Sequence, residues 1–449
     1  MDWIKLLNCN RYGDVFSGGI KSQDRTAYQR DFDRIIFSNA FRRLQSKTQV
    51  FPLPQTDFLH TRLTHSLEAS CVGRSLGSLV GQTIIKRYKE LDVAGITFDL
   101  FASVVANACL AHDIGNPPFG HSGESAISEY FRSNRNNKIL KDLNNDQISE
   151  LENFEGNALG FRILTKTFPR QSSIKGGLRL TYATLGAFMK YPKGALPLFK
   201  DTECVSNKKY GYFSSEKRNI EAIAEILDLK KKTDVNGAWY RHPLTFLVEA
   251  ADDICYMVMD LEDGVKLNLL QFKQVEEFLK AILSDFNSVK YAKIIDEREK
   301  LSYLRSKVIS ELISQVAEFF LDNEKSIMNC RYDNYIMSEI RSSSVLKEIH
   351  KVSIEKIYEY RKVIEIDAAG FEILYGLLDT FLNAALGERT YKNLNNIKLI
   401  PNQFLTDDVI SADGRYEIIL NVAQFISGMT DTFALNTYKI LKGITIPVY

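Results

Sequence analysis

One apolar segment with an abrupt end most constrains how this chain can fold. Residues Asp99 to Ile114 are mainly small and aliphatic, and Gly115-Asn116-Pro117-Pro118 follows them directly. Such a run is typical of a buried α-helix, and the Gly and Pro residues predict where it stops. His112 and Asp113 are therefore expected in its last turn, where an ionisable pair is costly without a counter-charge.

Helical periodicity dominates the rest of the chain. Apolar residues recur at helical steps over 63–88, 219–229 and 242–266, and several charged amphipathic helices are expected within 270–360. Alternating strand patterns are scarce, and the polar segment 133–150 is expected to be a loop. We predict an all-α protein, a single unit over residues 1–449 with a metal-binding helical core at about 60–265. Additional C-terminal helices are expected over about 266–449.

Composition narrows the classes of partner. The 57 basic and 56 acidic residues balance, so net charge does not support a nucleic-acid partner. Local basic clusters at 42–43, 86–87, 208–209 and 230–232 are expected to be solvated surface. The six scattered cysteines indicate reduced thiols, and no apolar run approaches the length of about 18 residues needed for a membrane helix. We expect a soluble, cytoplasmic protein with no membrane partner.

Metal-ligand residue types occur in a fixed order along the chain. His65 is followed by His112-Asp113 and then by Asp252-Asp253. On a helix, Asp252 shares a face with Tyr256 and Asp260, whereas Asp253 points about 100° away. We therefore take Asp252 as a ligand and Asp253 as a supporting residue, although both could instead cap the helix or form salt bridges. Two imidazoles and two carboxylates suit one divalent metal, either Mn, Fe, Co, Ni or Zn, or Mg if waters complete its shell.

A second polar pair, His121 and Glu124, follows the central dyad at a spacing of i, i+3. If Ser122 caps the following helix, His121 lies just outside its N-terminus, and Glu124 would hold one tautomer of the imidazole. A pair of this kind suits proton transfer to a leaving oxygen or from a water. The alternative is that Glu124 only completes the first helical turn.

These residues and their surroundings resemble a known family. His65, His112-Asp113 and Asp252 fit the H…HD…D pattern of the HD superfamily of metal-dependent phosphohydrolases, and the wider match resembles its bacterial dGTPase (deoxyguanosinetriphosphate triphosphohydrolase) family. The matching segments are RRLQSKTQVFP (42–52), RLTHSLE (62–68), AHDIGNPPFGH (111–121), NFEGNA (153–158), LTYATL (180–185), KYP (190–192), EAADDI (249–254) and SGMTD (427–431).

The resemblance implies an HD fold that hydrolyses a deoxynucleoside triphosphate (dNTP), either dGTP or several dNTPs, to the deoxynucleoside and inorganic triphosphate. Water would attack the α-phosphorus. The metal ligands would be His65, His112, Asp113 and Asp252, and His121 and Glu124 would form the catalytic pair, with the water-activating member unassigned. Gln49 would meet the deoxyribose, Tyr256 would exclude a 2′-hydroxyl, and Arg62, Lys190, Tyr191 and Asp260 would lie on the phosphate side. A homo-oligomer is also expected, with subunit contacts that could form a site for a dNTP activator.

The sequence departs from this pattern at three places. Asn116 and Gly156 stand where many relatives would have histidine, and Thr432-Phe433 follows SGMTD without an expected basic residue. The base preference is therefore left open. Two alternatives remain: another HD phosphohydrolase, acting on nucleoside monophosphates or alarmones, and a non-catalytic HD protein that binds nucleic acid or protein.

Overall fold

The computed structural model describes residues 1–14, 25–50, 60–166, 177–198, 204–405 and 414–446. Across these residues the chain is helical, and its only β-pairing consists of isolated bridges. The all-α prediction is confirmed. Phe51 and Pro52, the end of the first matching segment, lie outside the described residues.

The helices are α1 Trp3–Leu6, α2 Ala27–Ile36, α3 Asn39–Arg42, α4 Arg62–Arg87, α5 Lys89–Val93, α6 Phe98–Ala111, α7 Gly120–Ser133, α8 Asn145–Glu152, α9 Gly156–Thr165, α10 Tyr182–Phe188, α11 Lys217–Leu227, α12 Thr245–Lys266, α13 Phe272–Ile282, α14 Ser288–Ala292, α15 Glu297–Met328, α16 Ser343–Ser353, α17 Arg361–Leu386, α18 Tyr391–Ile397, α20 Arg415–Ser427 and α21 Asp431–Leu441. Short 3₁₀ turns occupy Arg43–Ser46, Lys138–Leu140, Val205–Asn207, Ser214–Glu216 and Ile336–Ser338, and a π-helical turn spans Ile354–Tyr358.

Two expectations about local structure away from the candidate site are wrong. The segment 133–150 is not all loop, because α8 begins at Asn145 behind a capping box in which Asn144 and Gln147 bond each other's backbone N–H. The basic cluster 230–232 is not all solvated surface either. Lys232 is 5% exposed, and its ammonium donates to Ser206, Asn207 and Asp333.

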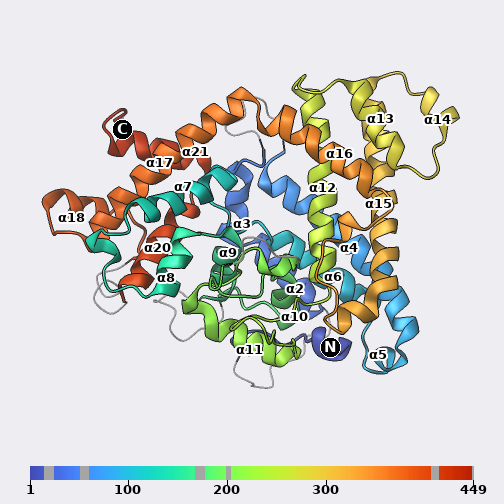
Figure 1. The fold of residues 1–449 in the computed structure, drawn as a ribbon, viewed down its shortest axis with the longest axis horizontal. Coiled ribbons are helices and arrows are strands. Elements are labelled where there is room, and N and C mark those ends of the chain that lie inside the picture. The colour runs from blue at the N-terminus through green and yellow to red at the C-terminus, as the bar shows by residue number, and fades with distance from the viewer. Residues whose placement is uncertain (15–24, 51–59, 167–176, 199–203, 406–413, 447–449) are drawn as a thin grey trace.

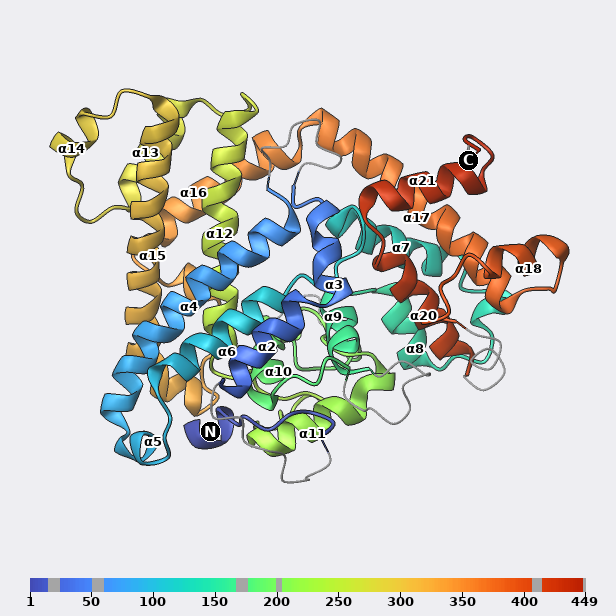
Figure 2. The ribbon, with the colours of Figure 1, turned by 180° about the vertical axis from the view of Figure 1, so that it is seen from behind.

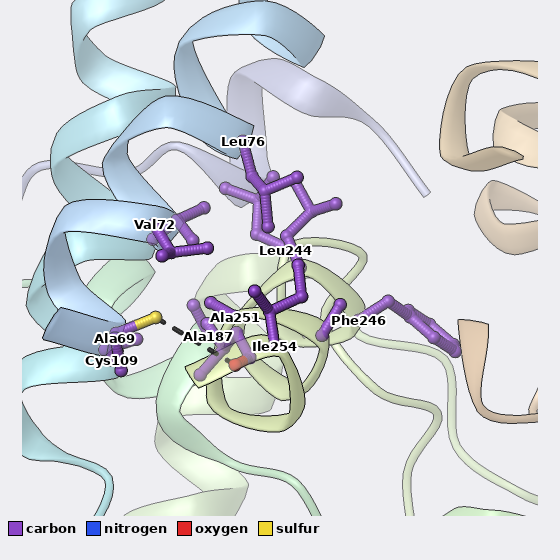
Figure 3. Packing of buried hydrophobic residues seen from close by; sticks show 14 of the residues in the cluster. Ala69, Val72, Leu76, Cys109, Ala187, Leu244, Phe246, Ala251 and Ile254 are labelled. Atoms are coloured by element: carbon purple, nitrogen blue, oxygen red, sulfur yellow. Dashed lines mark hydrogen bonds between the residues drawn. The ribbon is translucent and has the colours of Figure 1, made fainter. Parts of the chain in front are cut away.

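Helices α4, α6 and α12 pack against one another and form the centre of the fold (Figures 1 and 2). The backbones of α4 and α6 approach closely at Gly77, where an added Cβ would lie 2.7 Å from the carbonyl oxygen of Phe101. Figure 3 shows part of the apolar core between these helices, including Ala69, Cys109 and Ala251. These three residues stand four, three and one positions from His65, His112 and Asp252, so the core fixes the backbone that carries the candidate ligands.

A second apolar cluster joins α7, α8 and α9 to α17, α20 and α21. Both clusters draw on helices from each side of residue 265, and the expected boundary there stays a prediction. In the two ribbon views α13 and α14 lie at one end of the molecule, and α18 and the C-terminus lie at the other (Figures 1 and 2).

Among the described residues no single helix is long and apolar enough to cross a membrane. Helices α20 and α21 meet that length and composition test only as a pair, bent by 112°.

Candidate metal and phosphate site

The four predicted metal ligands come from helices α4 and α12 and from the turn that follows α6. His65 lies in the first turn of α4, which Thr61 caps, and Asp252 lies in the middle of α12. Helix α6 ends at Ala111, so His112 and Asp113 lie in the turn beyond it rather than in its last turn. The chain tightens there, because the backbone N–H groups of His112 and Ile114 bond carbonyls three residues back instead of four.

The side chains of the four predicted ligands lie in contact with one another. Nε2 of His65 lies 2.9 Å from Oδ1 of Asp252. Nε2 of His112 lies 3.3 Å from Oδ1 of Asp252 and 3.3 Å from Oδ1 of Asp113. The ligand atoms of His65, His112 and Asp113 all lie within 4.8 Å of one another, and all three residues are buried. These three side chains could hold a divalent cation, and Asp252 lies beside them through its contacts with both imidazoles.

The surroundings prepare His112 to act as a ligand. Its Nδ1 lies 2.6 Å from the carbonyl oxygen of Cys109, which fixes the proton on Nδ1 and leaves the Nε2 lone pair facing the cluster. Asn116 donates to Oδ1 of Asp113 at 2.5 Å and orients that carboxylate. Asn116, which departs from the family pattern, thus contacts the Asp113 carboxylate through its side-chain amide.

Two cations hold the outer oxygens of the carboxylates. Arg62 donates to Oδ2 of Asp113 at 2.8 Å, and Lys190 donates to Oδ2 of Asp252 at 2.6 Å. The structure therefore brings both predicted phosphate-side cations to the ligand cluster. Burial raises the pKa of both carboxyl groups, but the positive charges of Arg62 beside Asp113 and Lys190 beside Asp252 outweigh burial and hold each pKa below its ordinary value. Both carboxylates are thus ionised and competent to bind a metal.

The second polar pair lies on α7, close to the cluster. Helix α7 begins at Gly120 after Phe119, whose φ is 62°, so the expected cap at Ser122 is wrong and His121 belongs to the first helical turn. Nδ1 of His121 lies 2.8 Å from Oε2 of Glu124, and the backbone N–H of Gly156 donates to Oε1 of Glu124 at 2.7 Å. A Cβ added at Gly120 would lie 2.7 Å from Nη2 of Arg62, which shows how close the start of α7 comes to the cluster.

The environments of His121 and Glu124 differ sharply. The side chain of His121 is 85% exposed, whereas that of Glu124 is 10% exposed. Burial raises the pKa of Glu124, but its hydrogen bond with His121 and the charge of Lys209 outweigh burial and lower it. Ionised Glu124 accepts a hydrogen bond from the N–H at Nδ1 of His121, and this leaves Nε2 of the ring facing solvent.

The predicted sugar-side residues occupy two places. Oε1 of Gln49 is buried and has no hydrogen-bond partner among the described residues. The ring of Tyr256 stacks on that of Tyr358, with centroids 5.7 Å apart, and Tyr358 donates to Asp260 at 2.5 Å. Asp260, expected on the phosphate side, is therefore joined to the sugar-side tyrosines, and within the described part of the chain it forms no ion pair. Burial raises the pKa of Asp260 to about 7.

The remaining predicted residue, Tyr191, and two residues that were not predicted, Lys209 and Glu155, lie near the candidate site. Tyr191 is buried next to Lys190. His121 and Glu124 line a cavity of about 280 Å³. Two residues that the sequence pattern did not single out, Lys209 and Glu155, line the same cavity, and their side chains lie 3.0 Å apart. Lys209 was read only as part of a basic surface cluster. Its role as a partner of Glu155 depends on a contact over 54 residues, which the sequence pattern does not reveal.

Comparison with known proteins agrees with this architecture. Residues 62–153 match the HD domain model, so the fold and the ligand cluster define an HD-domain protein. The chain is 40% identical to a deoxyguanosinetriphosphate triphosphohydrolase-like protein of Synechocystis, over 99% of this chain and 100% of the relative. It is 36% identical to such a protein of Pseudomonas aeruginosa over the full length of both, and 29% identical to a deoxyguanosinetriphosphate triphosphohydrolase of Serratia proteamaculans over 95% and 97%. The chain belongs to the deoxyguanosinetriphosphate triphosphohydrolase-like family of HD-domain hydrolases.

Proposed function

We propose that this chain hydrolyses a deoxynucleoside triphosphate to a deoxynucleoside and inorganic triphosphate. The observation that carries the proposal is the convergence of four ligand atoms with Arg62 and Lys190 bonded to the outer carboxylate oxygens. A triphosphate carries about four negative charges near neutral pH, more than one divalent metal neutralises, so cations must converge on it. His65, His112, Asp113 and Asp252 would hold the metal, which supplies Lewis-acid polarisation of a phosphoryl oxygen.

In the proposed reaction water attacks the α-phosphorus and the bond from that phosphorus to the 5′ oxygen breaks. One proton of the water is transferred overall to the leaving 5′ oxygen, and the triphosphate leaves with the new oxygen. Glu124 holds the Nδ1 proton of His121, so that Nε2 can exchange a proton with the water or the leaving oxygen. Arg62 and Lys190 can turn from the carboxylates to the phosphates when metal and substrate bind.

Sugar recognition would use the two remaining features of the site. Oε1 of Gln49, which has no partner within the part of the chain that the structure describes, can accept a hydrogen bond from a deoxyribose hydroxyl, and that bond would remove the cost of leaving it buried and unbonded. Tyr256, held by its stacking on Tyr358, would occupy the space that a 2′-hydroxyl needs. The substrate class proposed is therefore dNTP rather than NTP, with the base left open.

Product analysis tests this proposal. Purified protein is incubated with each dNTP and each NTP, singly and in pairs, with Mg or Mn, and the products are resolved. We expect deoxynucleoside and inorganic triphosphate in equal amounts from at least one dNTP. Release of orthophosphate or pyrophosphate would contradict the proposal. Turnover only when two dNTPs are present would reveal an activator, and equal turnover of NTPs would contradict the role of Tyr256.

A further inference from the structure

The segment 427–431, which runs from the last residue of α20 to the first residue of α21, contacts two loops of the candidate site although it lies far from them in the sequence. Asp431, 2% exposed, is the residue that makes most of these contacts. Its Oδ2 accepts hydrogen bonds from the backbone N–H of Thr48, at 2.9 Å, and from the Thr48 hydroxyl. Its Oδ1 accepts from the backbone N–H of Phe119 at 3.1 Å. One buried carboxylate therefore connects residues 48 and 119.

The two loops carry different parts of the proposed chemistry. Thr48 directly precedes Gln49, whose buried Oε1 lacks a partner among the described residues. Phe119 precedes the first residue of α7 and lies two residues before His121. Backbone N–H groups at a helix start have no partner within the helix, so the bond from Phe119 to Asp431 satisfies one of them and fixes where α7 begins.

A second connection runs beside the first. The ammonium of Lys47, 2% exposed, donates to the carbonyl oxygens of Ser427 and Asn116, each at 2.6 Å. The backbone N–H of Arg62 donates to the carbonyl of Lys47 at 3.2 Å. Residues 47 and 48 are thus bonded to the start of α4, to the turn after Asp113 and to the segment 427–431.

We propose that Asp431 is a positioning residue of the reaction. It holds the loop that carries Gln49 and the start of the helix that carries His121 and Glu124 in one fixed relation, so that sugar-binding and proton-transfer groups meet the same substrate molecule. This inference rests on the proposed function and gives the SGMTD segment a role in it. Misplacement of either loop by about 1 Å is enough to lower a rate by on the order of 100-fold.

The fold supplies a matched control of the same chemistry. Asp31, fully buried in α2, accepts from the backbone N–H of Thr181 at 2.9 Å and from its hydroxyl at 2.7 Å. This Asp–Thr arrangement repeats that of Asp431 and Thr48. Asp31 in addition accepts from the Thr184 hydroxyl at 2.9 Å and forms an ion pair with Arg11 at 2.7 Å, and none of these residues belongs to the candidate site. Asp31→Asn therefore measures what the loss of such a contact does to the fold alone.

The first test compares Asp431→Asn with Asp31→Asn. An amide offers one oxygen, so in either orientation at 431 one backbone N–H, of Thr48 or Phe119, faces an NH₂ group. The amide oxygen can accept two hydrogen bonds from Thr48, from its backbone N–H and its hydroxyl, but only one from Phe119. We therefore expect the bond from Phe119 to be lost and the start of α7 to shift. The result expected is a fall in kcat for dNTP hydrolysis of about 10- to 100-fold in Asp431→Asn. Asp31→Asn, which also removes the charge that faces Arg11, should lose at least as much thermal stability and keep its kcat.

A second pair keeps the inference testable if Asp431→Asn does not fold. Thr48→Val removes only the hydroxyl donor and should raise KM for the dNTP several-fold, with little change in kcat, because it loosens the Gln49 loop. The conservative variant Thr48→Ser keeps a hydroxyl at this position and should keep the wild-type KM. Equal KM values in the two variants, or equal kcat in Asp431→Asn and Asp31→Asn, would overturn this inference while the wild type still turns over dNTPs. Absence of dNTP turnover in the wild type would overturn the proposed function and this inference with it.

Discussion

Oδ1 of Asp252 lies 2.9 Å from Nε2 of His65, which joins α12 to α4 across 187 residues of sequence. Asp253, the next residue, makes no comparable contact with either histidine within the described part of the chain. We predict that Asp252→Asn removes bound metal and lowers turnover more than about 100-fold, because loss of a ligand exceeds the effect of losing a supporting residue. Asp253→Asn is the matched control and should retain metal. Metal content by elemental analysis is measured together with turnover. Equal loss of metal in both variants would show that Asp252 was wrongly preferred to Asp253 as the ligand.

If His121 and Glu124 form the catalytic pair, removing His121 should impair turnover without removing the metal. His121→Ala should lower kcat by about 10²- to 10⁴-fold, the usual contribution of a positioned acid or base, without loss of metal. Glu129→Gln, on the exposed face of the same helix, is the control and should behave as wild type. If His121→Ala retained its kcat, the pair would only complete the helical turn.

The stacking of Tyr256 on Tyr358 predicts a change in sugar selectivity. Tyr256→Ala should raise the ratio of NTP to dNTP turnover by about 10-fold or more, since removing a steric block is worth roughly 1–3 kcal/mol. Tyr256→Phe keeps the ring and should keep the wild-type ratio. The measurement is competition between a dNTP and its ribonucleotide in one reaction. An unchanged ratio in Tyr256→Ala would show that discrimination lies elsewhere.

His242 predicts how stability depends on pH. Its Nε2 donates to the carbonyl of Leu6 at 3.0 Å and its Nδ1 accepts from the backbone N–H of Leu244 at 3.1 Å, so the neutral ring is held by both neighbours. Burial lowers its pKa to about 4. Between pH 4 and about 6.5 the unfolded chain binds a proton on this histidine that the folded chain does not, so the stability that His242 contributes falls as pH is lowered through this window, by about 3 kcal/mol.

Urea unfolding at several pH values checks this prediction. The difference in stability between the wild type and His242→Gln should shrink as the pH is lowered from 6.5 to 4, even though His242→Gln is the less stable of the two at pH 7. His350→Gln, on an exposed surface of α16, should leave the slope unchanged. A slope that is the same in His242→Gln and in the wild type would assign the acid sensitivity to other groups.

Periodicity predicted the central helices well. The expected helices over 63–88 and 242–266 correspond to α4 and α12, because their apolar faces are buried in one core and the pattern records that burial. The prediction for 133–150 was wrong because α8 is polar and depends on its cap rather than on an apolar stripe. The start of α7 was misplaced because it depends on a left-handed Phe119, a conformation that the sequence does not signal.

Candidate ligands could be named from local motifs, since His65, His112-Asp113 and Asp252 each lie in a recognisable segment. The residues that hold these ligands in place could not be named from local motifs. The bonds from Thr48 to Asp431 and from Lys47 to Ser427 join residues about 380 positions apart, and only the packed fold brings them together. The attachment of Asp260 to Tyr358 depends on a π-helical turn that periodicity does not reveal.

Hydrolysis in ¹⁸O-labelled water identifies the phosphorus atom that water attacks and the bond that breaks. Attack at the α-phosphorus with loss of the 5′ oxygen predicts one ¹⁸O atom in the inorganic triphosphate and none in the deoxynucleoside, and no labelled product from His112→Ala. Label in the deoxynucleoside or in orthophosphate or pyrophosphate, or undiminished labelling of triphosphate by His112→Ala, would contradict the account.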